Sequence, residues 1–267
     1  MAHAGLLRPM GLLEIIDQTF RLYRSNFWLF FGISAVVYLP FGLINLLPGA
    51  AFLLMPALLL VVGALTKAVS DRYLGQAASV GVSYAYVARR LLPFVGTMIV
   101  AYIFVGLGAL LLLVGAIVFA FWITFVTEVF ILEDKRYFAA IWRSKFLIGK
   151  GVWAEVLGLG IIVGILTMLI QAAAGLALGA PFLFLTGEES EVYWLAQGLI
   201  SGLVQSLVAP IGLVASILLY YDSRIRKEGF DLEVLAREMG LEPAAAPGAE
   251  TPQIPPMPPS GSEEKVE

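Results

Sequence analysis

The chain of 267 residues contains no cysteine and only one histidine. The lack of cysteine excludes disulfides, thiol nucleophiles and thiolate-bound metals. A single histidine, His3, leaves nothing from which to build a His-ligated metal site or a His-based triad. Charge is also scarce, at 14% of the residues. We therefore expect no catalytic residues, no metal, no cofactor and no nucleic-acid partner, and we expect that the protein is not an enzyme.

Apolar residues instead make up 60% of the chain, and the mean hydropathy is +0.88. A bilayer core about 30 Å thick needs roughly 20 apolar residues per helix. The apolar runs predict an all-α, polytopic membrane helical bundle with spans at residues 27–47, 51–69, 94–113, 116–132, 153–178 and 193–221. We expect the first run to be a retained span and not a signal peptide, because no small-residue cleavage pattern follows it.

The fourth span follows from length. As one helix, residues 93–132 would run about 60 Å at 1.5 Å per residue, twice the thickness of the core. The chain should therefore fold back, with the turn expected at Val114-Gly115. The six helices then form three transmembrane hairpins.

The basic residues orient these hairpins. All 17 Lys and Arg residues lie before residue 27, between 67 and 90, between 135 and 150, or after 221. With six spans these four segments share one side of the membrane, and the last loop of the other side carries Glu188, Glu189 and Glu191. The positive-inside rule then predicts a multi-pass membrane protein with both termini in the cytoplasm.

Each hairpin follows a segment with helical amphipathic spacing, which predicts a helix lying along the cytoplasmic interface. These segments are residues 12–24, 80–91 and 138–149. Their apolar faces are expected to hold Leu12, Leu13, Ile16, Phe20 and Tyr23 in the first, Val80, Tyr84, Val87 and Leu91 in the second, and Phe138, Ile141, Trp142 and Phe146 in the third. The membrane domain should cover residues 1–238. The remaining stretch, 239–267, is rich in proline and predicts a disordered cytoplasmic tail.

Three polar residues inside the expected spans are candidates for a binding role, because a polar group in lipid must find a partner or line a wet cavity. They are Glu128, Gln171 and Gln205. Glu128 could hold a proton or cation, or could pair with an interfacial cation. The two glutamines could bind a solute, or could make interhelical hydrogen bonds.

Pairs of glycines four residues apart let membrane helices approach closely. The pairs are Gly160 with Gly164, Gly175 with Gly179, and Gly198 with Gly202. We expect them to pack the spans 153–178 and 193–221 together, within one subunit or between subunits.

The centre of the chain resembles a known family. The residues are Phe130-Ile131-Leu132-Glu133, followed by Ala139-Ala140-Ile141-Trp142-Arg143-Ser144 and later Gly151-Val152-Trp153. They are similar to the signature of the bacterial glycerophosphoryl diester phosphodiesterase membrane domain, in which a Glu ending one span precedes an Ala-x-x-Arg-Ser segment. The resemblance implies a six-helix inner-membrane module without the catalytic barrel of fused members. Its motif residues here are Glu133, Arg143, Ser144, Gly151 and Trp153.

Two functions remain open. The first is a non-enzymatic scaffold, accessory subunit or lipid-interacting module with a basic cytoplasmic face. In it, Arg89, Arg90, Arg143 and Lys150 are candidates to bind lipid phosphate, and Arg143 and Ser144 could instead hold the third interfacial helix against the bundle. The expected partners are membrane lipids, and other membrane proteins or a second copy are alternatives. The second function is a small-molecule or ion transporter or channel that uses Glu128, Gln171 and Gln205.

Overall fold

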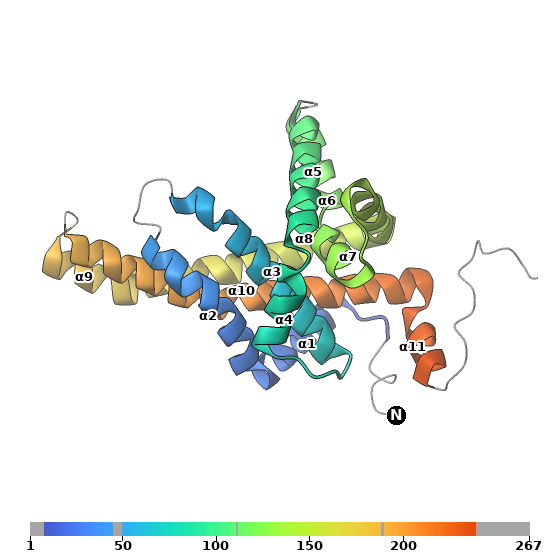
Figure 1. Cartoon of the computed structure of the whole chain (residues 1–267), viewed down its shortest axis with the longest axis horizontal. Helices are drawn as coiled ribbons and strands as arrows, with labels where there is room; N and C mark the ends of the chain where they lie inside the picture. Colours follow the sequence, from blue (N-terminus) through green and yellow to red (C-terminus); the bar gives the residue numbers. More distant parts are fainter. Residues whose placement is uncertain (1–7, 45–49, 111, 188–189, 239–267) are drawn as a thin grey trace, which may run out of the picture.

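The computed structural model describes residues 8–44, 50–110, 112–187 and 190–238, and all regular structure in these ranges is helical (Figure 1). The expected all-α class is therefore confirmed. The expected tail, residues 239–267, lies outside the described part of the chain. The helices are α1 (Leu12–Ser25), α2 (Phe27–Ile44), α3 (Ala50–Tyr73), α4 (Val80–Ala88), α5 (Leu91–Ala109), α6 (Leu112–Trp122), α7 (Val126–Glu133), α8 (Tyr137–Ala174), a π-helical segment Gly175–Gly179, α9 (Ala180–Thr186), α10 (Glu191–Glu228) and α11 (Phe230–Glu238).

Several helices are long and apolar enough to cross a membrane. Within the described residues there are four, Leu91–Ala109, Gly115–Glu133, Val152–Thr186 and Glu191–Glu228, with a fifth if the bent pair α1 and α2 is one span. They overlap four of the expected spans and fit a membrane-embedded protein. The expected span 27–47 runs into residues 45–49, which lie outside the described part. The helix that contains the expected span 51–69, α3, carries Lys67, Asp71 and Arg72 near its end.

The central helix is α10, which packs against α1, α2, α3, α8, α9 and α11. Its closest crossing is with α2 and depends on glycine. A Cβ atom on Gly198 would lie 2.2 Å from the carbonyl oxygen of Gly42, and one on Gly202 would lie 2.5 Å from that of Tyr38. The two backbones therefore touch directly, as small residues in membrane helices allow.

The core lies toward the carboxyl half of α10. Its largest fully buried side chains are Phe30, Phe94, Phe125, Phe130 and Tyr220, from α2, α5, α7, α10 and the turn before α7. The second half of α8, with α9, forms a hairpin with the start of α10 and extends away from this core (Figure 1). It exposes apolar side chains such as Ile161, Met168 and Phe184. An exposed apolar hairpin of this length fits contact with lipid.

The turn expected at Val114-Gly115 is wrong, because α5 ends at Ala109 and α6 already begins at Leu112. Gly115 has a packing role instead. A Cβ atom on Gly108 would lie 2.8 Å from the carbonyl oxygen of Gly115, so these glycines let α5 and α6 approach each other. In Figure 1 this hairpin points in a different direction from α10. The arrangement of six spans in three hairpins therefore stays a prediction.

The first expected interfacial segment is α1, which bends by 82° from the axis of α2. Its apolar face differs from the expected one. Ile15, Thr19, Leu22 and Tyr23 are buried, mainly against α10, whereas Leu13 is 79% exposed. Phe20 is also exposed. The outer side of α1 therefore exposes two apolar side chains, those of Leu13 and Phe20, among charged residues.

The second expected segment is α4, which ends at Ala88, so Leu91 belongs to α5 and not to its face. Val87 is fully buried as expected. Two tyrosines hold α4 in place by donating to backbone carbonyls. Tyr84 donates to Ile33 of α2 at 2.6 Å, and Tyr86 donates to Ile131 of α7 at 2.9 Å.

The third expected segment is the first part of α8, which a break at Gly149 (φ 20°, ψ 175°) separates from the rest of the helix. Ile141 is buried in the core, so its assignment to one face with the aromatic residues is wrong. Phe138, Trp142 and Phe146 form an exposed strip with a spacing of four residues. Such a strip fits the membrane–water interface, where aromatic rings concentrate.

Candidate functional site

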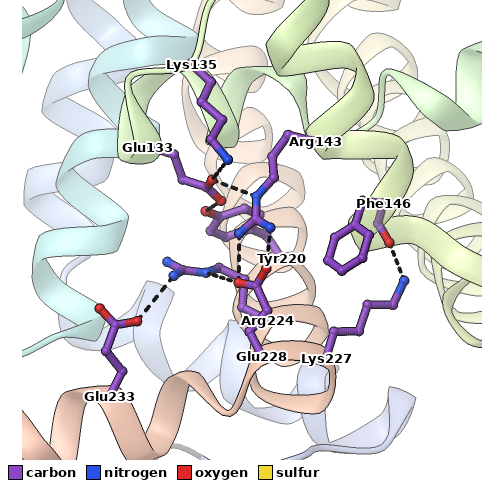
Figure 2. Close-up of polar contacts among 9 residues, drawn as sticks. All are labelled: Glu133, Lys135, Arg143, Phe146, Tyr220, Arg224, Lys227, Glu228 and Glu233. Carbon is purple, nitrogen blue, oxygen red and sulfur yellow. Dashed lines mark hydrogen bonds and ion pairs between the residues drawn. The ribbon is translucent and has the colours of Figure 1, made fainter. Parts of the chain in front are cut away.

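A cluster of ionic and aromatic side chains joins the end of α7, the first part of α8, the end of α10 and α11 (Figure 2). We call it the ionic cluster. Its members are Glu133, Lys135, Arg143, Phe146, Tyr220, Arg224, Lys227, Glu228 and Glu233. It contains two residues of the central family-like motif, Glu133 and Arg143, together with the end of α10.

Arg143 is the centre of the ionic cluster. Its Nε donates to Glu133 Oε2 at 2.7 Å, and its two terminal nitrogens donate to the two carboxylate oxygens of Glu228. Burial by itself lowers the pKa of Arg143, but the hydrogen bonds and charges of Glu228 and Glu133 outweigh it and raise this pKa above its usual value. Nε and both terminal nitrogens of Arg143 therefore donate to carboxylates of the protein itself. These contacts favour a role in holding the first part of α8 against α7 and α10, which we call the clamping role, over binding of a lipid phosphate.

Glu133 ends α7, and three side chains contact its carboxylate. Tyr220 of α10 donates its hydroxyl to Oε1 at 2.8 Å, while Arg143 and Lys135 share Oε2, the latter at 3.2 Å. The ring of Tyr220 is fully buried, and its position is fixed by an edge contact with Phe125, the rings being 5.9 Å apart. One carboxylate therefore ties α7 to both α8 and α10.

Arg224 extends the ionic cluster toward α11. Its Nε lies 3.2 Å from Glu228 Oε2, and its Nη2 lies 3.7 Å from Glu233 Oε2. The guanidinium also lies over the ring of Phe230, 4.1 Å from the centroid, which is a cation–π geometry. Gly229 ends α10 in a left-handed conformation, so the chain reverses and brings α11 to this position.

Lys227 stabilises the bend of α8 at Gly149. Its Nζ donates to the carbonyl oxygen of Phe146, and a Cβ atom on Gly149 would collide with that nitrogen at 2.1 Å. A cation at the carboxyl end of a helical segment satisfies a free carbonyl and opposes the helix dipole. The bend of α8 is therefore held by a side chain from α10.

A second cluster lies at Asp222, which is fully buried. Its Oδ1 accepts from the backbone N–H of Met10 at 2.6 Å, and its Oδ2 lies 2.8 Å from Nε of Arg226. Arg226 also donates to the carbonyl oxygen of Met10 at 2.6 Å and to Glu155 of α8 at 2.9 Å. These bonds fix the chain before α1 against α10.

Sequence reasoning missed this use of residues 220–228, because a basic and aromatic stretch after a span is typical of an anchor in the headgroups. The sequence did contain a signal for this use, namely the acidic residues expected on the same side of the membrane as the basic ones. Glu133, Glu155 and Glu228 could neutralise the basic side chains internally, and the structure pairs each of them with an arginine.

Ser144 contacts the turn between α6 and α7, which forms a break between the two helices. That break leaves the N–H of Phe125 without a helical acceptor, and the fully buried hydroxyl of Ser144 accepts it at 3.0 Å. Trp153 stacks on Phe121 of α6, with the ring centroids 4.5 Å apart. Gly151 lies in α8, and its surroundings and the side chain of Lys150 lie outside what the structure describes.

The other two phosphate candidates differ. Arg90 donates to the hydroxyl of Tyr86, lies over that ring and is 3.8 Å from Asp134. Arg89 is exposed and makes no ion pair with any described residue. Arg89 is therefore the better candidate of the pair.

The polar residues inside the spans do not converge. Glu128 is 2% exposed and accepts from Ser216 of α10 at 2.5 Å, while its Oε2 has no hydrogen-bond partner among the described residues. Gln205 lines a separate groove of about 430 Å³ between α2, α3 and α10. It lies eleven residues before Ser216, or about 16 Å along the helix. Gln171 lies on the protruding part of α8.

The glycine pairs also differ in their surroundings. Gly198 and Gly202 pack against α2, and not against α8 as expected, because α2 supplies the close backbone. Gly179 faces the amide of Gln197 on α10. A Cβ atom on Gly160, Gly164 or Gly175 would meet no described atom within 4 Å.

No set of three His, Cys, Asp or Glu side chains in the described part of the chain could hold a metal ion. No protein-family model, no curated protein and no solved structure matches the chain. The resemblance to the phosphodiesterase membrane domain therefore stays a prediction.

Proposed function

We propose that the protein is a non-enzymatic, multi-pass protein of the bacterial inner membrane that acts as a lipid-interacting scaffold or accessory subunit. Six spans in three hairpins would place both termini, the ionic cluster and the three amphipathic helices on the cytoplasmic side. The chain would thus belong to the type of membrane module that its central motif resembles.

The observation that carries this proposal is the contrast between two parts of the molecule. The polar structure gathers around residues 220–228, where α7, α8, α11 and the chain before α1 are fixed by ion pairs and hydrogen bonds. The hairpin of α8, α9 and α10 is in contrast apolar and exposed. A rigid cytoplasmic platform above lipid-facing helices suits docking or lipid contact better than chemistry.

The exposed aromatic strip of α8 supports contact with lipid headgroups. Lys145 lies 3.8 Å from the ring centroid of Trp122 and 4.6 Å from that of Trp142. Aromatic rings beside a lysine are the composition of an interfacial helix, in which the rings enter the headgroup region and the ammonium stays hydrated.

Fluorescence quenching tests this placement. The full chain is reconstituted in vesicles whose lipids carry bromine either high or low on the acyl chains. Wild-type protein should be quenched more strongly by the shallow bromine, and Trp142→Phe should reduce that difference. The matched control is Trp153→Phe, since Trp153 is half-buried against Phe121 and should contribute little to it. If deep bromine quenched the Trp142 signal more strongly, the interfacial position of α8 would be wrong.

Transport is the alternative, and one observation favours it: the buried Glu128 leaves one oxygen without a described partner. The separation of Glu128, Gln171 and Gln205 speaks against a shared pathway. A solute flux in proteoliposomes that is lost in Glu128→Gln but kept in Glu191→Gln, the same change at an exposed position, would favour transport over the scaffold proposal.

A further inference from the structure

The outer side of α1 carries a hollow that the ionic cluster does not involve. It is lined by Asp17, Phe20, Arg21, Arg24 and Ser25, and its volume is about 520 Å³. We call it the α1 hollow. At 100° per residue, positions 13, 17, 20 and 24 share one helical face, opposite to the buried Ile15, Thr19 and Leu22.

The charges of the α1 hollow are available to a ligand. Arg24 makes no ion pair or hydrogen bond with any described residue. Arg21 meets Asp17 only at 3.9 Å, and both side chains are largely exposed. Exposed pairs at this distance contribute little to stability, so a ligand that engages both groups displaces little.

The orientation of α1 brings this hollow to the membrane surface. The axis of α1 bends by 82° from that of α2, so α1 lies along the surface if α2 crosses the bilayer. Leu13 and Trp28, each 79% exposed, flank the α1 hollow at its two ends along the chain. Apolar side chains on both sides of a charged patch fit a helix whose outer strip enters the headgroup region.

The two signs of charge specify the headgroup. Guanidinium groups one turn apart, those of Arg21 and Arg24, can both donate to one phosphate. The carboxylate of Asp17 one turn earlier repels a purely anionic headgroup but attracts an ammonium. We propose that the α1 hollow binds a zwitterionic phospholipid with a primary ammonium group, of the phosphoethanolamine type, with its phosphate on Arg21 and Arg24 and its ammonium on Asp17.

The assignment rests on the proposed interfacial position of α1. A primary ammonium donates three hydrogen bonds to a carboxylate, whereas the quaternary ammonium of a phosphocholine donates none. Recognition by Asp17 therefore favours phosphoethanolamine over phosphocholine. Simple attraction of a basic surface would instead favour an anionic headgroup such as phosphoglycerol.

The experiment measures which lipids the purified full-length protein retains. Protein in detergent is mixed with equal amounts of phosphoethanolamine, phosphocholine and phosphoglycerol lipids with identical acyl chains, and native mass spectrometry counts the bound lipids. Wild-type protein should retain phosphoethanolamine over phosphocholine by up to about fivefold, the ceiling expected for an exposed ion pair. Asp17→Asn should abolish this preference, and Arg24→Gln should lower retention of all three lipids.

The matched control is Arg136→Gln, which removes an exposed arginine from the turn before α8 and should leave the preference unchanged. A preference for phosphoethanolamine that survives Asp17→Asn would overturn the assignment, and so would a wild-type preference for phosphoglycerol. Quenching of Trp28 by shallow bromine is measured as the difference between wild type and Trp28→Phe. It tests the interfacial position of α1 separately from the lipid assignment of the α1 hollow. If Trp28 is quenched but the lipid preference is absent, only the α1 hollow is assigned wrongly; if Trp28 is not quenched, the interfacial position of α1 fails as well.

Discussion

Arg143 connects α7, α8 and α10 through two carboxylates, and its side chain is only 15% exposed. Removing one partner of a largely buried ion pair leaves the other charges uncompensated. Arg143→Gln would place Glu133 and Glu228 side by side without the guanidinium between them. The contacts of Arg143 thus contribute to the stability of the protein itself, independently of any partner.

We expect Arg143→Gln to lower the free energy of unfolding by about 2 kcal/mol, below the value for a fully buried pair because water reaches the ionic cluster. Thermal unfolding in detergent measures it. The double variant Arg143→Gln with Glu228→Gln should recover part of the loss, because one uncompensated carboxylate is gone. Arg89→Gln is the control and should have no measurable effect. A loss for Arg143→Gln no larger than that of the control would contradict the clamping role.

Ser144→Ala should cost about 1 to 2 kcal/mol, because the N–H of Phe125 would lose its acceptor in a buried position. The same measurement applies. Ser201→Ala on the exposed side of α10 is the matched control and should stay close to wild type. Equal stability of the two variants would show that the bond to Phe125 contributes nothing.

The sequence identified Arg143, Ser144 and Glu133 through a local pattern, but it did not identify their partners. Tyr220 lies 87 residues from Glu133, and Glu228 lies 85 residues from Arg143. Spacing along a helix predicts contacts within one or two turns and carries no information at such separations. The sequence therefore could not show that Arg224 and Arg226 of α10 pair with carboxylates, or that Lys227 donates to the carbonyl oxygen of Phe146.

At the scale of the elements, the crossing of α2 and α10 depends on the absence of side chains. Gly198→Val should be destabilising by about 3 kcal/mol, because the new atoms would overlap the backbone at Gly42 and force the helices apart. Gly164→Val makes the same chemical change where no described atom lies within 4 Å.

Thermal unfolding of both variants tests this crossing, and Gly164→Val should unfold like wild type. If Gly164→Val were instead the destabilised variant, the open face of α8 would be the close contact and the crossing of α2 with α10 would be wrong. A loss of oligomer in Gly164→Val, with unchanged stability of the monomer, would assign that face to self-association.

Helices were easier to predict than their faces. Long apolar runs determine a helix in lipid because every backbone group must be bonded within the chain, and α5, α8 and α10 follow from this. The faces of α1 and α8 were harder, because an interfacial helix is apolar both toward the protein and toward the lipid. Leu13 and Phe138 are exposed while Ile15 and Ile141 are buried, a division that periodicity alone does not make.

On the scale of the whole molecule, the account requires a polar cytoplasmic flank and an apolar part that crosses the bilayer. Residues 220–228 gather the ends of α7, α8 and α11 and the start of the described chain at this flank. The α8–α10 hairpin leaves it in the other direction (Figure 1). The length of α10, 38 residues or about 57 Å at 1.5 Å per residue, exceeds the bilayer core, so the helix can continue from the apolar part into the polar flank.

The most direct test uses the absence of native cysteine, which gives a clean background for single cysteines. Thr186→Cys lies at the tip of the α8–α10 hairpin, and Gln76→Cys lies between α3 and α4, both at exposed positions. A membrane-impermeant maleimide should label Thr186→Cys in bacterial cells whose outer membrane has been made permeable. It should label Gln76→Cys only after the inner membrane is opened. Labelling of both cysteines from the same side would contradict the account.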